Sequence, residues 1–146
     1  MEITREAPTH PAVVTLCLAQ QAELAERDRV AFDDSPKVLD PRISFVVAWS
    51  AGEAIGCAAL QPLEPGVGEL KRMYVKPAER GRGVARAMLA EIETMAAAGG
   101  VTALRLETGR TFDDVIALYT GAGFVPIPLF GPYVGNTQSA CFEKPL

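Results

Sequence analysis

A glycine-rich segment at residues 80–85 (RGRGVA) limits what this chain can fold into more than any other feature. It stands between a strand-like apolar run, Leu70–Val75, and a helix-like run, Ala85–Ala98. A glycine-rich turn that opens a helix leaves several backbone N–H groups at the positive end of the helix dipole, where phosphate binds well. The segment therefore predicts a strand, a turn and a helix that together hold a phosphorylated cofactor.

The charge around this turn favours the same interpretation. Residues 71–86 contain six basic residues and one acid, whereas the whole chain has a net charge of −4. Proteins that bind nucleic acid usually carry a basic face over the whole domain. A basic patch in an acidic chain therefore favours one small anionic ligand and argues against nucleic acid as a partner.

Two motifs resemble the GNAT superfamily of N-acetyltransferases. The strand-like residues 69–77 followed by RxxGxA at residues 80–85 are similar to the acetyl-CoA motif of that family, Gln/Arg-x-x-Gly-x-Gly/Ala. Residues 117–124 (ALYTGAGF) are similar to the late helix of the family, which carries a tyrosine a few residues before a Gly-Phe pair. Two motifs in the right order are more specific than one. The resemblance covers roughly residues 43 to 146.

The apolar periodicity predicts a strand, a helix, three strands, a helix, a strand, a helix and a final pair of strands. The expected strands cover residues 2–6, 43–50, 54–60, 69–75, 101–108, 124–127 and 140–143. The expected helices start at Thr9 (as N-cap), at residue 85 and at residue 112, and the first of them is broken at residues 33–36 (DDSP). Prolines and glycines at Pro62, Pro65, Gly66 and Gly68 are expected to interrupt the chain before the fourth strand.

The resemblance implies the α/β (α+β) GNAT fold. This fold is a single mixed, strongly twisted sheet of six to seven strands, flanked by about four helices and splayed between its fourth and fifth strands. Length and composition agree with one domain over residues 1–146, because 49% of the residues are hydrophobic and no repeat or low-complexity tract interrupts them.

The cysteines and the apolar runs of the sequence indicate the cellular compartment in which the protein works. Cys17, Cys57 and Cys141 are far apart, lack CxxC spacing and share the chain with one histidine. This pattern indicates buried free thiols in a reducing compartment and no metal site. The sequence has no apolar run of membrane-spanning length and no leader pattern, so we expect a cytoplasmic protein without a membrane partner. A monomer and a homodimer are both compatible with these observations.

The resemblance implies that acetyl-CoA is the cofactor and the acetyl donor. The implied cofactor-binding residues lie at the end of the fourth strand and in the glycine-rich turn; they are Met73, Tyr74, Val75, Arg80, Gly81, Arg82, Gly83, Val84, Ala85 and Arg86. The chain departs from the family at Phe112, where many members have an asparagine that contacts the pantetheine arm.

Two residues are candidates for proton transfer. Acetyl transfer to an amine needs a neutral nucleophile, a polarised thioester and a proton donor for the leaving thiolate. Tyr119 occupies the position of the general-acid tyrosine of the family, and the pKa of a free phenol, roughly 10, is close to that of a thiol. Glu69 lies eleven positions before Arg80, which is the spacing of the general-base glutamate in the histone-acetylating branch. The alternatives are a packing role for Tyr119 and a solvated strand-edge position for Glu69.

We expect the acceptor to be a small primary amine that carries a carboxylate, acetylated directly in a ternary complex. The resemblance implies that residues 128–135 lie over the acceptor site, where Phe130 and Tyr133 would form its wall. Alternation along a strand places Lys71 on the face of Glu69 and Arg72 on the other face, and one of these cations would pair with the carboxylate.

Other interpretations stay open. The two cations could attract only cofactor phosphates, the acceptor could be a protein or peptide, and the chain could be a non-catalytic acyl-CoA sensor. A nucleoside triphosphate binder would need GxxxxGK[ST], which the sequence lacks.

Overall fold

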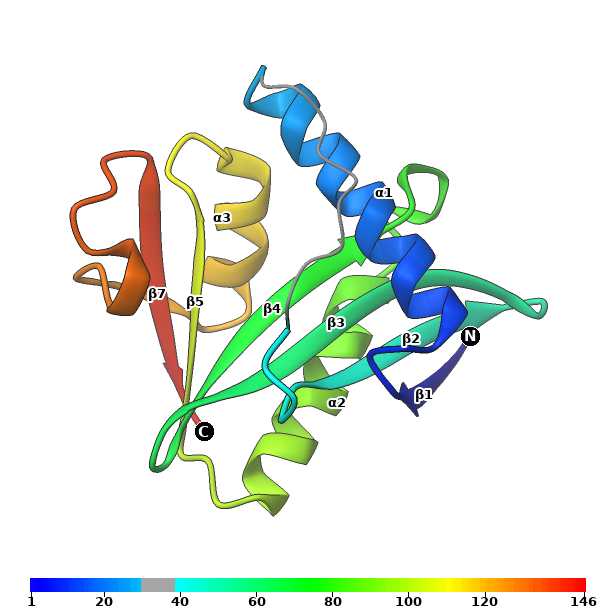
Figure 1. Ribbon diagram of the computed structural model, residues 1–146, viewed down its shortest axis with the longest axis horizontal. Helices are drawn as coiled ribbons and strands as arrows, with labels where there is room; N and C mark the ends of the chain where they lie inside the picture. Colours follow the sequence, from blue (N-terminus) through cyan, green and yellow to red (C-terminus); the bar gives the residue numbers. More distant parts are fainter. Residues whose placement is uncertain (30–38) are drawn as a thin grey trace.

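The computed structural model describes residues 1–29 and 39–146, and all of their strands belong to one seven-stranded mixed sheet (Figure 1). The strands are β1 (Glu2–Glu6), β2 (Ser44–Ser50), β3 (Glu53–Glu64), β4 (Val67–Val75), β5 (Ala103–Gly109), β6 (Val125–Ile127) and β7 (Ser139–Pro145). The helices are α1 (Pro11–Arg27), α2 (Val84–Ala98) and α3 (Asp113–Gly121), with short 3-10 helices η1 (Pro77–Glu79) and η2 (Gly131–Tyr133). The predicted α/β class and the predicted order of elements are confirmed.

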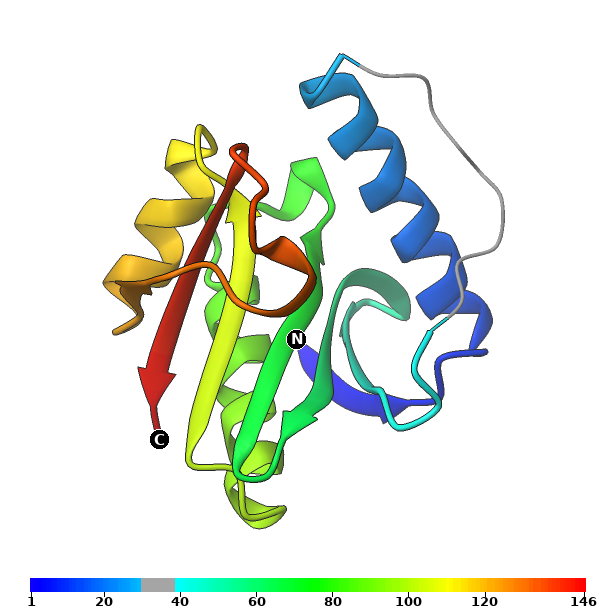
Figure 2. The same cartoon turned by 60° about the vertical axis from the view of Figure 1, so that its left-hand side comes forward.

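The sheet has the order β1-β2-β3-β4-β5-β7-β6, and helices cover both of its faces (Figure 2). On one face, α1 buries Val13 and Leu16 against Phe45 and Cys57. On the other face, α2 and α3 pack on a larger cluster; its fully buried members include Val46, Met88, Ile92, Leu104 and Phe124. None of the helices described has the length and apolar character needed to cross a bilayer.

Strands β4 and β5 are parallel and pair over only three residues, from Val67 opposite Ala103 to Glu69 opposite Arg105. By contrast, β5 pairs with β7 along its whole length, from Ala103 to Gly109. Beyond Glu69 the two strands diverge, and the gap widens toward their C-terminal ends (Figure 1). The expected splay between the fourth and fifth strands is therefore present, and it leaves backbone groups of β4 without a neighbouring strand.

Local chemistry explains where the first two helices begin. The α1 N-cap is His10 and not Thr9, because the His10 Nδ1 atom accepts the Ala12 N–H at 3.0 Å, and Pro11 fits the first helical position. Helix α2 has Gly83 as its N-cap, with φ = +80°, a conformation that glycine adopts at little cost. The predicted break at residues 33–36 lies outside the described residues.

The predicted interruption between the third and fourth strands is shorter than expected. Strand β3 continues through Pro62 to Glu64, and β4 already begins at Val67, so only Pro65 and Gly66 form the turn. Pro62 lies opposite Gly68 beside a shift in register, and strands tolerate proline at such bulges.

Candidate active site

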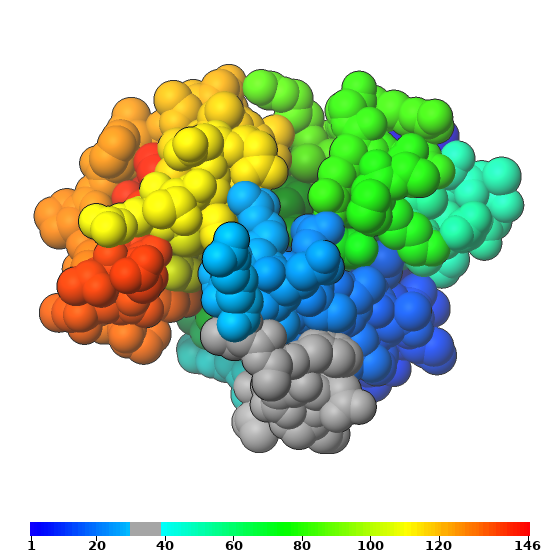
Figure 3. Space-filling view, turned by 90° about the horizontal axis from the view of Figure 1, so that it is seen from above, coloured from blue at the N-terminus to red at the C-terminus, as the bar shows by residue number. Residues whose placement is uncertain are grey.

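A cleft of about 840 Å³ opens where β4 and β5 part. Its walls come from the second half of α1, the end of β4, the glycine-rich turn, the start of α2, the end of β5, helix α3 and the segment before β7. The space-filling view shows this hollow between the segment that leads from β4 into α2 (green) and the β5–α3 side (yellow), with α1 (blue) beside it (Figure 3).

The glycine-rich turn presents unpaired backbone donors to this cleft. Gly81 and Gly83 have φ of +78° and +80°, and a Cβ added at either glycine would meet no atom within 4 Å. Within the part of the chain that is described, the N–H groups of residues 81–86 donate to no protein acceptor, and the first helical bond runs from Ala87 N to Gly83 O at 3.0 Å. Free N–H groups at a helix N-terminus suit a pyrophosphate, so the donor set fits the predicted cofactor.

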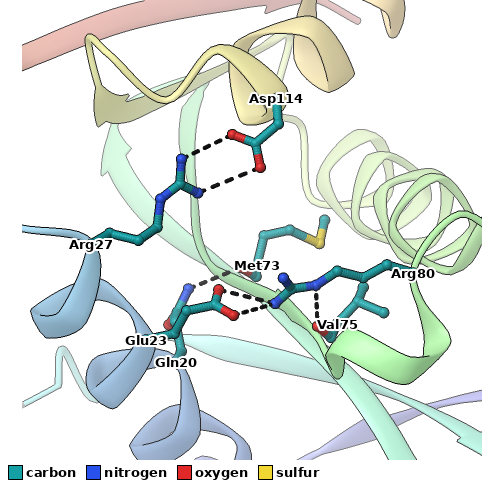
Figure 4. Close-up of polar contacts among 7 residues, drawn as sticks. All are labelled: Gln20, Glu23, Arg27, Met73, Val75, Arg80 and Asp114. Atoms are coloured by element: carbon teal, nitrogen blue, oxygen red, sulfur yellow. Dashed lines mark hydrogen bonds and ion pairs between the residues drawn. The ribbon is translucent and has the colours of Figure 1, made fainter.

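Helix α1 contacts both sides of the cleft through one polar face (Figure 4). The Gln20 Nε2 atom donates to the Met73 carbonyl at 2.9 Å, so α1 is bonded to the end of β4. Arg27 pairs with Asp114 of α3 at 3.0 Å, and its guanidinium lies 3.9 Å from the Phe112 ring centre. Phe112, which replaces the expected asparagine, is therefore an apolar platform for an α1 cation.

Arg80 is held on two sides. Its Nε donates to the Val75 carbonyl at 2.9 Å, and its Nη2 contacts both carboxylate oxygens of Glu23 at 2.8 and 2.9 Å (Figure 4). Sequence reasoning missed Gln20, Glu23 and Arg27 as site residues. Their spacing of three and four places them on one helical face, and this polar stripe is the signal that could have identified them.

Tyr119 lies in the wall of the cleft, as its predicted role requires. The side chain is 5% exposed and meets Phe124 edge-on, with 5.5 Å between ring centres. Burial raises the pKa of Tyr119 above its ordinary value. The phenol is therefore protonated at neutral pH and available as a donor.

Glu69 lies beside the cleft and not in its lining. The Tyr133 hydroxyl donates to the Glu69 Oε2 atom at 2.7 Å, and Lys71 Nζ lies 3.8 Å from the same oxygen. Phe130 packs edge-on against Tyr133 at 5.3 Å between ring centres. Burial, with the neighbouring Glu69 carboxylate, raises the pKa of Tyr133. Glu69 and Lys71 of β4 thus form one partly buried group with Phe130 and Tyr133 of the loop before β7, and none of the four lines the cleft.

Arg72 does not follow the alternation expected from the sequence. It has φ = +57° at a β-bulge, where the β3–β4 register shifts between Cys57 and Ala59. Leu70 packs in the α2 cluster, whereas Arg72 lies beside Cys17 and Cys57 on the α1 side, and the Cys57 thiol donates to the Arg72 carbonyl at 3.4 Å. Arg72 lines the cleft, and its buried Nε has no hydrogen-bond partner in the part of the chain that the structure describes.

Glu107 is a further carboxylate of the cleft that sequence reasoning missed. It lies on β5 beyond the last β4 pairing, and the Ser139 hydroxyl donates to its Oε2 atom at 2.6 Å. Among the described residues, Glu107 has no ion pair with a basic side chain. No local motif marks this residue, because the fold alone brings it into the same cleft lining as Tyr119. Nowhere in residues 1–29 and 39–146 do three histidine, cysteine or acidic side chains gather as a metal site would require.

Comparison with known proteins identifies the family. The model of the acetyltransferase (GNAT) family matches residues 10–124. The chain belongs to this family. A curated relative, the IAA acetyltransferase of Azospirillum brasilense, is 41% identical over 99% of this chain and 97% of its own. The GNAT chain is thus an acyltransferase of the N-acetyltransferase type, and acetyl-CoA is its acetyl donor.

Solved structures agree with this assignment. A proposed acyl-CoA N-acyltransferase from Klebsiella pneumoniae is 35% identical and superposes with a TM-score of 0.86 over 99% of this chain and 97% of that one. A GNAT acetyltransferase from Elizabethkingia anophelis with acetyl-CoA bound is 18% identical, with a TM-score of 0.75 over 99% and 97% of the two chains, and it shares the fold.

Proposed function

We propose that this GNAT enzyme transfers an acetyl group directly to the primary amine of a small metabolite that carries a carboxylate, in a ternary complex. Acetyl-CoA supplies the acetyl group as a thioester. The N–H groups of residues 81–86 would hold its pyrophosphate, with Arg82 and Arg86 adding positive charge nearby. The name of the Azospirillum relative, an IAA acetyltransferase, supports an acceptor of small-molecule size.

One observation carries the carboxylate part of the proposal. Arg72 lines the cleft, and its buried Nε has no hydrogen-bond partner among residues 1–29 and 39–146; leaving such a donor unpaired costs about 1–3 kcal/mol. Lys71 instead contacts Glu69 and Tyr133, outside the cleft lining. Arginine also suits two-point contact with a carboxylate better than lysine does. Arg72 is therefore the proposed partner of the acceptor carboxylate.

Two proton transfers complete the proposed reaction. The acceptor arrives as an ammonium ion, loses a proton to a carboxylate and then attacks as a neutral amine, while Tyr119 protonates the departing sulfur. Glu69 is the base proposed from the resemblance, and its Oε2 atom accepts from the Tyr133 hydroxyl. Glu107 is the alternative base, because it already lies in the same cleft as Tyr119. Phe130 and Tyr133 would cover the acceptor.

The test compares an amino acid, its amide and a lysine-containing peptide as acceptors, in wild type, Arg72→Ala and Lys71→Ala. We expect wild type to prefer the acid over the amide by about tenfold in kcat/KM, since a charge-assisted hydrogen bond contributes at least that much. Arg72→Ala should lose this preference, and Lys71→Ala should keep it.

Other outcomes point to other functions. Equal kcat/KM for acid and amide in wild type rejects the carboxylate, and a preference for the peptide indicates a protein N-acetyltransferase. Tight acetyl-CoA binding without transfer to any amine indicates an acyl-CoA sensor.

A further inference from the structure

Two thiols from different layers meet between α1 and the sheet. Cys57 on β3 is fully buried in the α1-side cluster, and Cys17 on α1 packs against that cluster while part of it stays exposed. The two thiols lie next to each other where Cys17 packs against this cluster. The acetyl-transfer chemistry proposed above uses neither of them, and the third cysteine, Cys141, lies on β7 in another part of the fold.

Arg72 lies next to this pair of thiols. The Cys57 thiol donates to the Arg72 carbonyl at 3.4 Å, and the buried Arg72 Nε has no hydrogen-bond partner among the residues described. The positive charge of Arg72 favours an anion beside it. The adjacent Cys57 thiol and the charge of Arg72 both lower the pKa of Cys17, whereas the adjacent Cys17 and burial raise the pKa of Cys57. Of the two thiols, Cys17 therefore ionises more readily, and Cys57 keeps its proton.

We propose that Cys17 is a peroxide-reactive thiol and that it closes a disulfide with Cys57. Partial exposure, a neighbouring cation and an adjacent second thiol are the features of a redox-reactive cysteine. The Cys17 thiolate attacks one oxygen of hydrogen peroxide, the O–O bond breaks, and the hydroxide released takes up a proton to leave as water. The Cys57 sulfur then displaces hydroxide from the Cys17 sulfenic acid, and its proton leaves in a second water molecule. Both thiols are oxidised, and one peroxide is reduced.

The bond would fix α1 to β3. Helix α1 carries Gln20, Glu23 and Arg27, which contact β4, the glycine-rich turn and α3 around the cleft (Figure 4). A cross-link between residues 17 and 57 also restricts the unfolded chain, so it stabilises the folded state. We therefore expect a rise in Tm on oxidation that dithiothreitol reverses.

The experiment exposes the reduced full-length chain to hydrogen peroxide, alkylates the remaining thiols after denaturation, and measures intact mass and cross-linked peptides. Wild type and the control variant Cys141→Ala should both form a Cys17–Cys57 cross-link within the monomer. Cys57→Ala should stop at a Cys17 sulfenic acid that dimedone traps, and Cys17→Ala should leave Cys57 reduced. In Arg72→Met, Cys17 should react with peroxide about tenfold more slowly, because a nearby opposite charge favours the ionised form.

Three results would overturn the proposal: a full set of alkylatable thiols after peroxide treatment of wild type, a disulfide that involves Cys141, or equal Cys57 oxidation with and without Cys17. The mass readout needs no enzymatic activity and no acceptor. A failure of the proposed acetylation therefore leaves this test intact.

Discussion

Replacing Gly83 by valine should remove acetyl-CoA binding while leaving the chain folded. The backbone of Gly83 has φ = +80°, and a Cβ there would enter open space at the mouth of the cleft, beside the unpaired N–H groups of residues 81–86. A valine in that conformation costs about 1–3 kcal/mol of stability. Losing two charge-assisted hydrogen bonds to the pyrophosphate costs roughly 3–6 kcal/mol more in binding, which corresponds to at least about a hundredfold in Kd.

Gly100 offers a matched control, because it follows the other end of α2 with φ = +81° and equally open surroundings. Gly100→Val should therefore lower Tm about as much as Gly83→Val does, and it should keep the wild-type Kd for acetyl-CoA. Isothermal titration calorimetry and thermal denaturation measure both quantities. A folded Gly83→Val protein with unchanged affinity, or an equal loss of affinity in Gly100→Val, would refute the role of the turn.

Further predictions concern proton transfer. Tyr119→Phe keeps the ring packed against Phe124 and removes only the hydroxyl. We expect kcat to fall by about 10²–10⁴-fold with little change in acetyl-CoA affinity. A variant with wild-type turnover would show that Tyr119 is a packing residue. Because burial raises the pKa of Tyr119 above its ordinary value, the phenol stays protonated to higher pH than a free tyrosine, and kcat should show no loss from Tyr119 ionisation below about pH 10. If Glu69 or Glu107 is the base, the acidic limb of the pH profile of kcat/KM should disappear in the corresponding variant, Glu69→Gln or Glu107→Gln. The limb should persist in the control Glu143→Gln, which changes a β7 residue that pairs with Arg105. An unchanged profile in both test variants would assign the base to water or substrate.

Much of the fold could be predicted because local signals and tertiary structure agree. The apolar periodicity gave the order of elements, and the glycines at 81 and 83 marked the start of α2, since only glycine adopts positive φ at little cost. The element boundaries that differ from the prediction depend on local contacts that the secondary-structure propensities of single residues do not reveal. One is the imidazole of His10, which caps α1 where a threonine was expected, and another is Pro62, which a bulge accommodates within β3.

The site was harder to predict, because it depends on contacts between elements that are distant in the sequence. The bulge at Arg72 reverses the face expected from simple alternation, and one extra residue on a strand gives no clear signal in a single sequence. Glu107 comes to line the same cleft as Tyr119 through the splay of β4 and β5. The contribution of α1 depends on Gln20, Glu23 and Arg27 reaching three other elements.

Initial rates measured while acetyl-CoA and the acceptor are varied together test most directly whether the acetyl group passes straight to the amine. Double-reciprocal plots should give intersecting lines, because both substrates occupy the cleft before the transfer. Parallel lines, together with an acetylated enzyme detected by mass spectrometry in the absence of acceptor, would show a covalent intermediate and contradict direct transfer.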